Sequence, residues 1–261
     1  PFNFITKERT VFLRSICMKK QSSLKEALGL EKHDTIVAVG AGGKTTFCLA
    51  LCDELKNENK VFFTTTTKIF LPEIKENYNI YIRENIFENA FLESGAYIIG
   101  KERRGDDKIL PFDLETIDKL KEKCDYLIIE GDGSRMKPLK GWNETEPVFV
   151  KRTDKTIGVV SIKSVGLTIN ENNVHRADRF LKITKSALEE KVTVDHLCNM
   201  ICEKNGLFKD CMGEKVLLIN QTESETDHEN ALKLTELLKE RKINLDKIII
   251  SSLKNKTYYL I

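Results

Sequence analysis

The chain has 261 residues, of which 41% are hydrophobic, and its 42 basic and 40 acidic residues leave a net charge of +2. This length and apolar content suffice for one large α/β domain, and the balanced charge gives no reason to expect binding to nucleic acid or to an acidic membrane. No run approaches the ~18 apolar residues of a membrane helix, and Arg14 interrupts the apolar residues 11–13 too early for a signal peptide. We therefore expect a cytoplasmic protein.

The cysteine content indicates reduced thiols rather than disulfides. Seven cysteines are an odd number and include no Cys-x-x-Cys pair, in a chain without a secretory signature. Cys48 and Cys52 are four residues apart, as are Cys198 and Cys202, so each pair would share one helix face. Such pairs can bind a metal, but packing in a helix core is the interpretation that we favour. None of the cysteines stands in an evidently activating sequence context.

The first residues carry little structural signal. Residues 1–22 show no clear hydrophobic periodicity, and Met18 is a candidate native start. We expect residues 1–22 to be a poorly ordered extension and residues 23–261 to form a single domain. Ser23 and Glu26 have the spacing of a capping box, which predicts a short helix that ends before Gly29.

The most informative stretch is an apolar strand followed by glycines and a helix start. Residues 36–39 are an unbroken apolar run typical of a buried parallel strand, and residues 47, 51 and 55 give the next segment an apolar helical face. Backbone N–H groups of a glycine turn and the positive end of a helix can surround an anion, to which a lysine adds a full charge. The pattern is shorter than Gly-x4-Gly-Lys-Ser/Thr, because Ala38 stands where the first glycine would be. We predict a phosphate-binding loop formed by Gly40, Ala41, Gly42, Gly43, Lys44, Thr45 and Thr46.

The next predicted strand, which begins at residue 61, runs into four threonines and Lys68. These threonines can reflect strand propensity alone. Alternatively, the hydroxyls of residues such as Thr66 and Thr67 lie beside the phosphate loop, since ligands of open α/β sheets bind at the carboxyl ends of the strands. Both interpretations stay open.

Two carboxylates follow a second apolar strand. Residues 126–129 are apolar, Glu130 comes next, and Asp132 lies in a Gly-Asp-Gly sequence. In phosphate-loop NTPases a carboxylate at this position holds Mg²⁺ directly or through water, and the loop threonine, here Thr45, supplies another oxygen ligand. The alternative is an Asp-Gly turn that merely ends a strand. We favour a Mg²⁺ site that includes Thr45 and at least one of Glu130 and Asp132.

A basic cluster follows the acidic motif. It consists of Arg135, Lys137 and Lys140, and Trp142 and Glu146 come soon after. A solvated loop is the simplest interpretation, although a basic loop at the end of a strand can also contact phosphates or an acidic substrate. His175 lies in a predicted polar connection, and a lone histidine is more often structural than catalytic.

The remaining pattern alternates strands and helices, which predicts an α/β fold with a doubly wound, mostly parallel sheet, similar to a P-loop NTPase. Further strands are predicted at residues 80–82, 96–100, 156–162, 216–219 and 248–250, the last as the closing strand, and helices at 114–120, 195–204 and 230–241.

Several of these motifs together resemble the YqeC family over about residues 24 to 252. The resemblance is carried by Val-Gly-Ala-Gly-Gly-Lys-Thr-Thr, Thr-Thr-Thr-Lys, Ile-Ile-Glu-Gly-Asp-Gly-Ser-Arg with Pro-Leu-Lys, and Val-His-Arg at residues 174–176. That family is described as a selenium cofactor biosynthesis protein, or accessory protein of selenium-dependent molybdenum hydroxylases, with a fold like that of P-loop NTPases. At residues 220–223 the chain has Asn-Gln-Thr-Glu, whereas the family more often has Asn-Lys-x-Asp. In GTPases the Asn-Lys-x-Asp motif recognises guanine, so the base preference of this protein is open.

The resemblance implies a nucleoside-triphosphate-binding accessory protein, with ATP or GTP as substrate and Mg²⁺ as cofactor, that assists maturation of a selenium-dependent molybdenum hydroxylase. We expect hydrolysis in which Lys44 neutralises phosphate charge, Glu130 or Asp132 holds the metal with Thr45, and Arg135 or Lys140 stabilises the leaving charge. Thr66, Thr67 and Lys68 are implied as a second patch of the nucleotide site. The expected partners are the nucleotide and a molybdenum hydroxylase or its cofactor.

Two other functions stay open. The short glycine pattern also resembles the loop of Mur-type ligases, so the protein can instead be an ATP-dependent kinase or ligase. It can also be a non-catalytic carrier that holds a phosphate-bearing cofactor in the glycine loop and delivers it to a partner.

Overall fold

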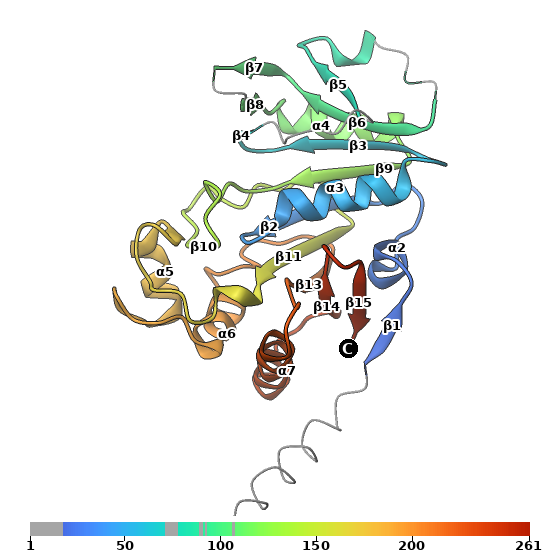
Figure 1. The fold of residues 1–261 in the computed structure, drawn as a ribbon. Coiled ribbons are helices and arrows are strands. Elements are labelled where there is room, and N and C mark those ends of the chain that lie inside the picture. Colours follow the sequence, from blue (N-terminus) through green and yellow to red (C-terminus); the bar gives the residue numbers. More distant parts are fainter. Residues whose placement is uncertain (1–17, 71–77, 89–90, 92, 106–107) are drawn as a thin grey trace, which may run out of the picture.

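The computed structural model describes residues 18–70, 78–88, 91, 93–105 and 108–261 (Figure 1). It is built on a ten-stranded sheet in which all pairings are parallel except the two at one edge. At that edge β1 (Lys19–Gln21) and β15 (Thr257–Leu260) pair antiparallel. From β15 onward the order is β14 (Lys247–Ser252), β13 (Glu214–Asn220), β11 (Lys155–Ser161), β2 (Thr35–Gly40), β9 (Tyr126–Glu130), β3 (Lys60–Thr65), β6 (Gly95–Gly100) and β5 (Asn79–Ile82).

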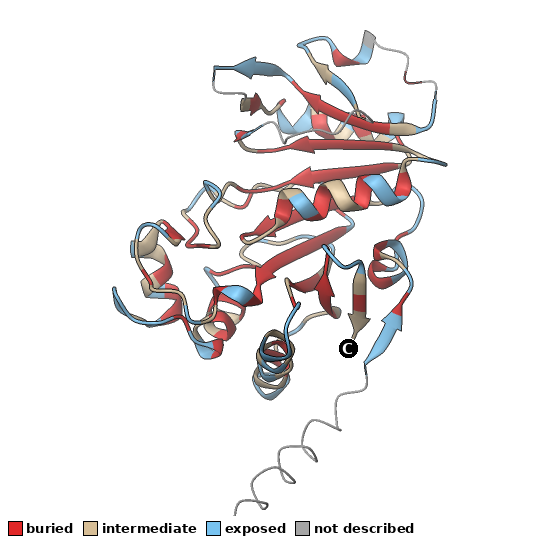
Figure 2. Ribbon diagram, in the orientation of Figure 1, coloured by how far each residue is buried: buried red, intermediate tan, exposed pale blue. Residues whose placement is uncertain are grey.

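Helices cover both faces of the sheet, as a doubly wound arrangement requires. In β2, Ile36 and Ala38 pack into one hydrophobic core and Val37 and Val39 into the other, because successive side chains of a strand point to opposite faces. Since both faces are buried, the central strands are buried along most of their length (Figure 2). The first core includes side chains of α2 (Leu24–Leu28) and α3 (Lys44–Leu55), and the second includes those of α4 (Leu114–Leu120), α5 (Ala177–Thr184), α6 (Val194–Cys202) and α7 (Glu225–Glu240).

Two small sheets and short helical turns complete the described elements. The pair β10 (Leu139–Lys140) and β12 (Val174–His175) is parallel, and β4 (Ile69–Phe70), β8 (Lys108–Leu110) and β7 (Glu102–Arg104) form an antiparallel sheet. The 3-10 turns span Ile86–Glu88, Lys121–Lys123 and Ile162–Ser164.

The order of the strands places β2 at the point where the winding of the sheet reverses. The chain passes from β2 to β3, later inserts β9 between them, and then adds β11 on the other side of β2. Ligands of open α/β sheets bind outside the carboxyl ends of the strands at such a point. The loop that follows Gly40 occupies this position.

Most of the expected elements are confirmed, including the short helix whose cap Ser23 accepts a hydrogen bond from the Glu26 amide. Three expectations differ. The strand near residue 250 is not the closing one, since β15 follows it, and the stretch after His175 contains α5 rather than only a polar connection. Residues 1–17 of the expected extension lie outside the described residues, whereas residues 19–21 form β1. No helix in the described part of the chain is long and apolar enough to cross a bilayer.

Candidate functional site

The glycine loop has a backbone that only glycine adopts readily. Gly40, Gly42 and Gly43 have φ values of 103°, 80° and 128°. A Cβ at Gly40 would lie 2.5 Å from the carbonyl oxygen of Val159, and one at Gly42 would lie 2.5 Å from the Cβ of Ser161. The loop is therefore fixed against the end of β11, and larger residues would displace it.

Helix α3 begins directly after this loop without a cap. Gly43 is its N-cap residue, and it supplies no side-chain cap hydrogen bond to the backbone amides of the first turn. The first amides of a helix have no intrahelical acceptor, and they carry the positive end of the helix dipole. The helix start that contains Thr45 and the exposed Thr46 thus presents unused donors at the carboxyl edge of the sheet.

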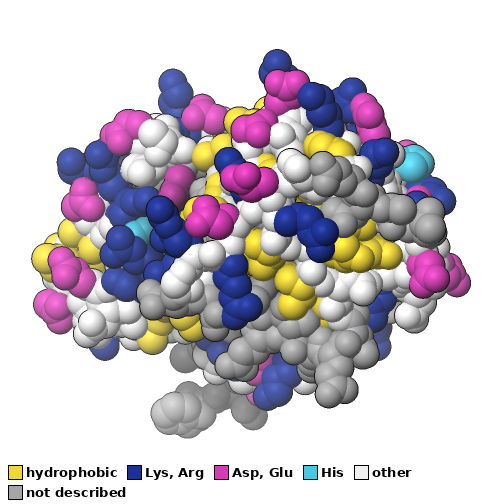
Figure 3. Space-filling model, turned by 90° about the horizontal axis from the view of Figure 1, so that it is seen from above, with side chains coloured by type: hydrophobic (Ala, Val, Ile, Leu, Met, Phe, Trp, Pro, Cys, Tyr) yellow, Lys and Arg dark blue, Asp and Glu magenta, His cyan; other side chains and the backbone are white. Residues whose placement is uncertain are grey.

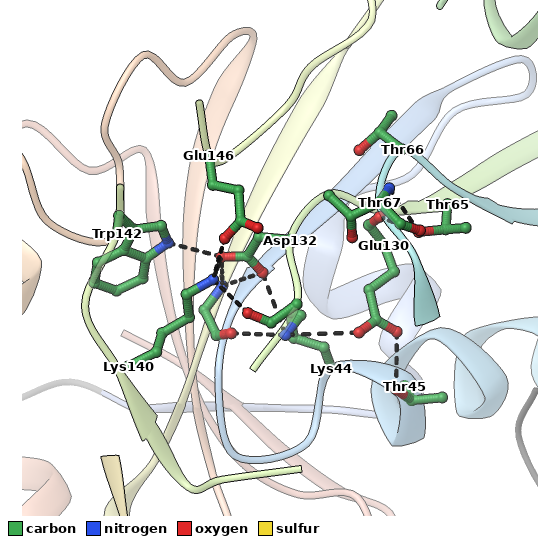
Figure 4. A network of polar contacts seen from close by, with 12 residues as sticks. Lys44, Thr45, Thr65, Thr66, Thr67, Glu130, Asp132, Lys140, Trp142 and Glu146 are labelled. Atoms are coloured by element: carbon green, nitrogen blue, oxygen red, sulfur yellow. Dashed lines mark hydrogen bonds and ion pairs between the residues drawn. The ribbon is translucent and has the colours of Figure 1, made fainter. Parts of the chain in front are cut away.

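Lys44 is buried between two carboxylates (Figure 4). Its ammonium donates to the carbonyl of Gly40 at 2.7 Å and lies 3.2 Å from Asp132 and 3.6 Å from Glu130. Burial alone would lower the pKa of Lys44, but the charges of Asp132 and Glu130 outweigh it and raise the pKa. Lys44 is therefore charged, and it stands where an anion in the glycine loop would meet it.

Asp132 is the centre of this polar network. It is fully buried, and its carboxylate accepts hydrogen bonds from the amide of Gly40 at 3.1 Å, from Lys140 Nζ at 2.9 Å and from Trp142 Nε1 at 2.7 Å. Burial raises the pKa of Asp132, but the ammonium groups of Lys44 and Lys140 more than offset this and hold the pKa below its usual value. The charged Asp132 thereby ties the glycine loop to the segment that carries Trp142.

The network continues from Lys140, in the β10–β12 sheet, through Glu146 to Arg176, which directly follows β12. Lys140 Nζ lies 3.0 Å from Glu146, and Arg176 holds the same carboxylate through two nitrogens, at 2.7 and 3.2 Å. Lys209 donates to the carbonyl oxygens of residues 143, 144 and 146, which anchors the segment 143–146 that carries Glu146. Glu146 therefore joins two cations that come from distant parts of the chain.

Glu130 and the threonines at and just after the end of β3 form the other side of the site. Thr45 Oγ1 donates to Glu130 at 2.8 Å, and burial raises the pKa of Glu130 although Lys44 and Thr45 oppose the rise. Thr65 Oγ1 donates to the Glu130 carbonyl at 3.0 Å, while Thr66 Oγ1 donates to the carbonyl of residue 148. Figure 4 shows Thr67 beside Glu130. Thr67 Oγ1 is buried and finds no hydrogen-bond partner among the described residues. Such an atom suits a water or a ligand oxygen.

The predicted site residues thus fall into two groups. The structure brings together the glycine loop, Lys44, Thr45, Glu130 and Asp132, with Thr66 and Thr67 at the adjoining strand end. Lys68 and Arg135 are exposed, and no ion pair of Arg135 is present in the described part of the chain. Within the same residues there is no cluster of three or more His, Cys, Asp or Glu side chains that could hold a metal by themselves. A metal here would need Thr45 and ligand oxygens in addition to the carboxylates.

A basic rim lies beside this site and is defined here as Arg135, Lys140, His175 and Arg176. Lys140 and His175 are register partners in β10 and β12, so their side chains lie on the same face of that small sheet. Figure 3 shows Lys and Arg side chains gathered around a histidine on the side of the molecule where Figure 1 shows β10 and α5. Burial, with added repulsion from Arg176, Lys140 and Arg135, lowers the pKa of His175 to about 4. His175 is therefore neutral at pH 7.

Sequence reasoning noted Trp142 and Glu146 without assigning them a role. No local pattern marks them, because their partners Asp132, Lys140 and Arg176 depend on how β10 and β12 pair. The only sequence patterns that pointed to this part of the site were the Pro-Leu-Lys and Val-His-Arg motifs at residues 138–140 and 174–176.

Comparison with known proteins agrees with these motifs. The family model described as YqeC protein matches residues 36–178, which contain the glycine loop, the acidic motif and the basic rim. "Uncharacterized protein YqeC" of Escherichia coli (strain K12) is 31% identical over 224 residues, which cover 83% of this chain and 86% of that protein. No solved structure matches the chain. From the family match and this long alignment, the chain belongs to the YqeC family.

Proposed function

We propose that the protein binds and hydrolyses a nucleoside triphosphate with Mg²⁺, on a fold of the P-loop NTPase type. The observation that carries the proposal is the convergence, at the carboxyl end of β2, of three features: the uncapped start of α3, the buried ammonium of Lys44 and the Thr45–Glu130 pair. Each feature alone also occurs in structural turns. Their combination supplies amides, a cation and metal-binding oxygens for one polyphosphate.

The phosphates are held by the loop amides and by Lys44. In the structure the charge of Lys44 is balanced by Glu130 and Asp132 and by the Gly40 carbonyl. A bound polyphosphate brings new negative charge to the same ammonium, while Asp132 keeps its bonds to the Gly40 amide and to Lys140. The loop therefore keeps its shape as the partner of Lys44 changes.

The donor set fits Mg²⁺, which binds through one or two protein oxygens together with substrate phosphates and water. Thr45 Oγ1 and Glu130 would hold the ion, and the Thr67 hydroxyl, which has no hydrogen-bond partner among the described residues, would be available to a water of the same site. Asp132, which the sequence also predicts as a ligand, already accepts from three donors, so we assign to it the positioning of Gly40 and Lys44. Bound there, Mg²⁺ would withdraw charge from the transferring phosphoryl group.

Arg135 is the remaining candidate for stabilising the leaving charge. Lys140, the alternative, is fully buried and engaged by Asp132 and Glu146, whereas Arg135 is exposed. Arg135 and Met136 have positive φ values of 51° and 61°, in the left-handed region that non-glycine residues rarely adopt. We therefore assign the role to Arg135 and the anchoring of the loop to Lys140.

The test is a thermal-shift panel of ATP, GTP, CTP and a molybdopterin nucleotide, each with and without Mg²⁺. A ligand at about one hundred times its dissociation constant adds about 2.7 kcal/mol, which raises the midpoint of a chain of this size by roughly 5 to 10 °C. We expect a Mg²⁺-dependent rise that Lys44→Ala abolishes and that Lys56→Ala, at the far end of α3, retains. A rise that survives in Lys44→Ala would refute the assignment.

The same thermal-shift panel identifies the nucleotide base that the protein prefers. The exits of β13 and β14 lie beside the loop, since a Cβ on Gly43 would come within 2.8 Å of the Asn220 amide nitrogen. Asn220 Oδ1 in turn accepts from the amide of Leu253 at 3.3 Å, so the two turns are joined. Glu223, where the guanine-reading motif has aspartate, is paired with Lys163 at 2.6 Å.

A second candidate, transfer of the phosphoryl group by a kinase or Mur-like ligase, is favoured by the basic rim. His175 is the register partner of Lys140, Arg135 is close enough to His175 to affect its pKa, and neither side chain belongs to the glycine loop, so they can hold an anionic acceptor. Product analysis by mass spectrometry separates the two: release of inorganic phosphate without an acceptor supports hydrolysis. Tight binding of the pterin nucleotide with no phosphate release from any triphosphate would favour a carrier instead.

We place this activity in the maturation of a selenium-dependent molybdenum hydroxylase, on the strength of the family resemblance. In a host that makes such a hydroxylase, deletion of the gene should remove hydroxylase activity while the hydroxylase polypeptide persists. Wild type should restore the activity and Lys44→Ala should not. Full hydroxylase activity in the deletion strain would overturn this role.

A further inference from the structure

A pair of cysteines lies at the end of α6, away from the network around Lys44. The Sγ atoms of Cys198 and Cys202 are 3.8 Å apart, within van der Waals contact. Cys198 is fully buried, whereas Cys202, the last residue of the helix, is partly exposed. Reagents can therefore reach Cys202 first, with Cys198 directly behind it.

The surroundings of Cys202 favour its thiolate. The thiol of Cys198 is within reach to donate to a Cys202 thiolate, and the guanidinium of Arg241, which donates to Asn199 Oδ1 at 2.5 Å on the same helix, lies beside it. The hydrogen bond from Cys198 lowers the pKa of Cys202, and Arg241 adds to this effect. Arg241 thus supplies positive charge at a helix end whose carbonyls alone would disfavour a thiolate.

The chain after Cys202 runs from this pair to the phosphate loop. Leu207 donates its amide to the carbonyl of Met200 at 2.9 Å, so the segment folds back on the last turn of α6. The side chain of Leu207 is fully buried against the backbone of Gly40 and of Gly158: a Cβ on these glycines would lie 2.7 and 2.8 Å from its methyl carbons. Two residues later, Lys209 holds the loop that carries Glu146.

We propose that Cys198 and Cys202 form an oxidisable dithiol whose conversion to a disulfide by a hydroperoxide alters the phosphate loop. The Cys202 thiolate attacks the hydroxyl oxygen of the peroxide, the O–O bond breaks, and the hydroxide or alkoxide that leaves takes from solvent the proton that Cys202 released on ionisation, which gives a sulfenic acid on Cys202 and water or an alcohol. The Cys198 sulfur then attacks the Cys202 sulfur. An S–S bond forms, the S–O bond breaks, and the hydroxyl leaves as water with the Cys198 proton. Two thiols are oxidised by two electrons, and one peroxide is reduced.

Closing the disulfide requires a change in α6. Cβ atoms four residues apart on a helix are about 5–6 Å apart, whereas a disulfide needs about 3.5–4.5 Å. The last turn of α6 must unwind to bridge this difference, and it holds Leu207 through the carbonyl of Met200. Displacement of Leu207 from Gly40 is the expected consequence, with loosening of the loop between β2 and α3.

The first measurement is the reactivity of the thiols on the full chain. At pH 7 we expect iodoacetamide to modify Cys202 about tenfold faster than Cys211, which is similarly half-buried but whose pKa burial raises. After treatment with hydrogen peroxide, mass spectrometry should find a dithiothreitol-reversible bridge between Cys198 and Cys202 in wild type and in the control Cys211→Ser. Cys198→Ser should stop at oxidised Cys202 without a bridge. No bridge in wild type, or equal reactivity of Cys211, would overturn the proposal.

A separate measurement tests whether oxidation of the cysteine pair affects the phosphate loop. Hydrogen exchange of residues 40–44 and 203–211 should accelerate on oxidation of wild type and stay unchanged in peroxide-treated Cys202→Ser. A bridge that forms without any change in exchange at residues 40–44 would refute the coupling. Neither measurement depends on nucleotide binding, so the outcome is separate from that of the function proposed above.

Discussion

Replacing Asp132 by asparagine would remove one negative charge from the most enclosed part of the site while the side chain keeps its size. The carboxylate accepts hydrogen bonds from Gly40, Lys140 and Trp142 and lies 3.2 Å from the ammonium of Lys44. An asparagine offers only one acceptor oxygen and carries no charge, so the buried ammonium groups of Lys44 and Lys140 each lose one carboxylate partner. Removing one partner of a buried ion pair costs about 3–5 kcal/mol.

The expected loss in the free energy of unfolding corresponds to a fall in the melting temperature of roughly 6 to 20 °C. Urea and thermal unfolding of Asp132→Asn measure it. Glu122→Gln is the matched control, because Glu122 pairs with Arg152 at the surface, with both side chains more than half exposed, and such pairs contribute only about 0–1 kcal/mol.

A double-mutant cycle isolates the pair itself. Adding Lys140→Met to Asp132→Asn removes a buried ammonium that has lost one of its two carboxylate partners and keeps only Glu146, so the double variant should be more stable than the sum of the two single losses predicts. If Asp132→Asn lost no more stability than Glu122→Gln, the assignment of Asp132 as the anchor of the glycine loop would be wrong.

Three further predictions follow from the geometry of the site. Gly42→Ala places a Cβ 2.5 Å from Ser161 at a φ of 80° and should abolish the nucleotide-induced thermal shift, whereas Gly133→Ala, with nothing within 4 Å, should retain it. Trp142→Phe keeps an aromatic side chain, although a smaller one, but loses the 2.7 Å hydrogen bond to the buried carboxylate, so urea unfolding should show a loss of at least about 1.5–3 kcal/mol. The pKa of His175 is lowered from 6.5 to about 4 in the folded state, so the unfolded chain takes up the proton first. Thermal stability of wild type should therefore fall between pH 6.5 and 4 more steeply than that of His175→Asn, and equal slopes would contradict a buried neutral imidazole.

Elements with strong local patterns were predictable from the sequence. The apolar run before Gly40 and the four-residue spacing of Phe47, Leu51 and Leu55 identify β2 and α3, because a buried parallel strand and an amphipathic helix each leave a periodic signal. Glu130 at the end of an apolar strand was equally visible, and the structure places it 2.8 Å from Thr45.

The elements that the sequence did not reveal depend on long-range pairing. Helix α5 follows Arg176, which has a φ of 55° and gives no side-chain cap, so the usual start signal is absent. Strand β15 is only four residues long and is recognisable through its antiparallel partners β14 and β1. Likewise, the environment of Cys202 depends on Arg241, which reaches it from the end of α7.

The position of β2 in the sheet also has a consequence for how the chain folds. Both neighbours of β2, β9 and β11, come much later in the sequence, as do Leu207 and the other side chains that enclose the glycine loop. During synthesis β2 and α3 therefore emerge long before their partners, with apolar surface and strand edges uncovered. Parallel pairings between such distant segments form slowly. We expect a nascent chain that stops before β11 to be held by chaperones or to aggregate, and the glycine loop to acquire its geometry late in folding.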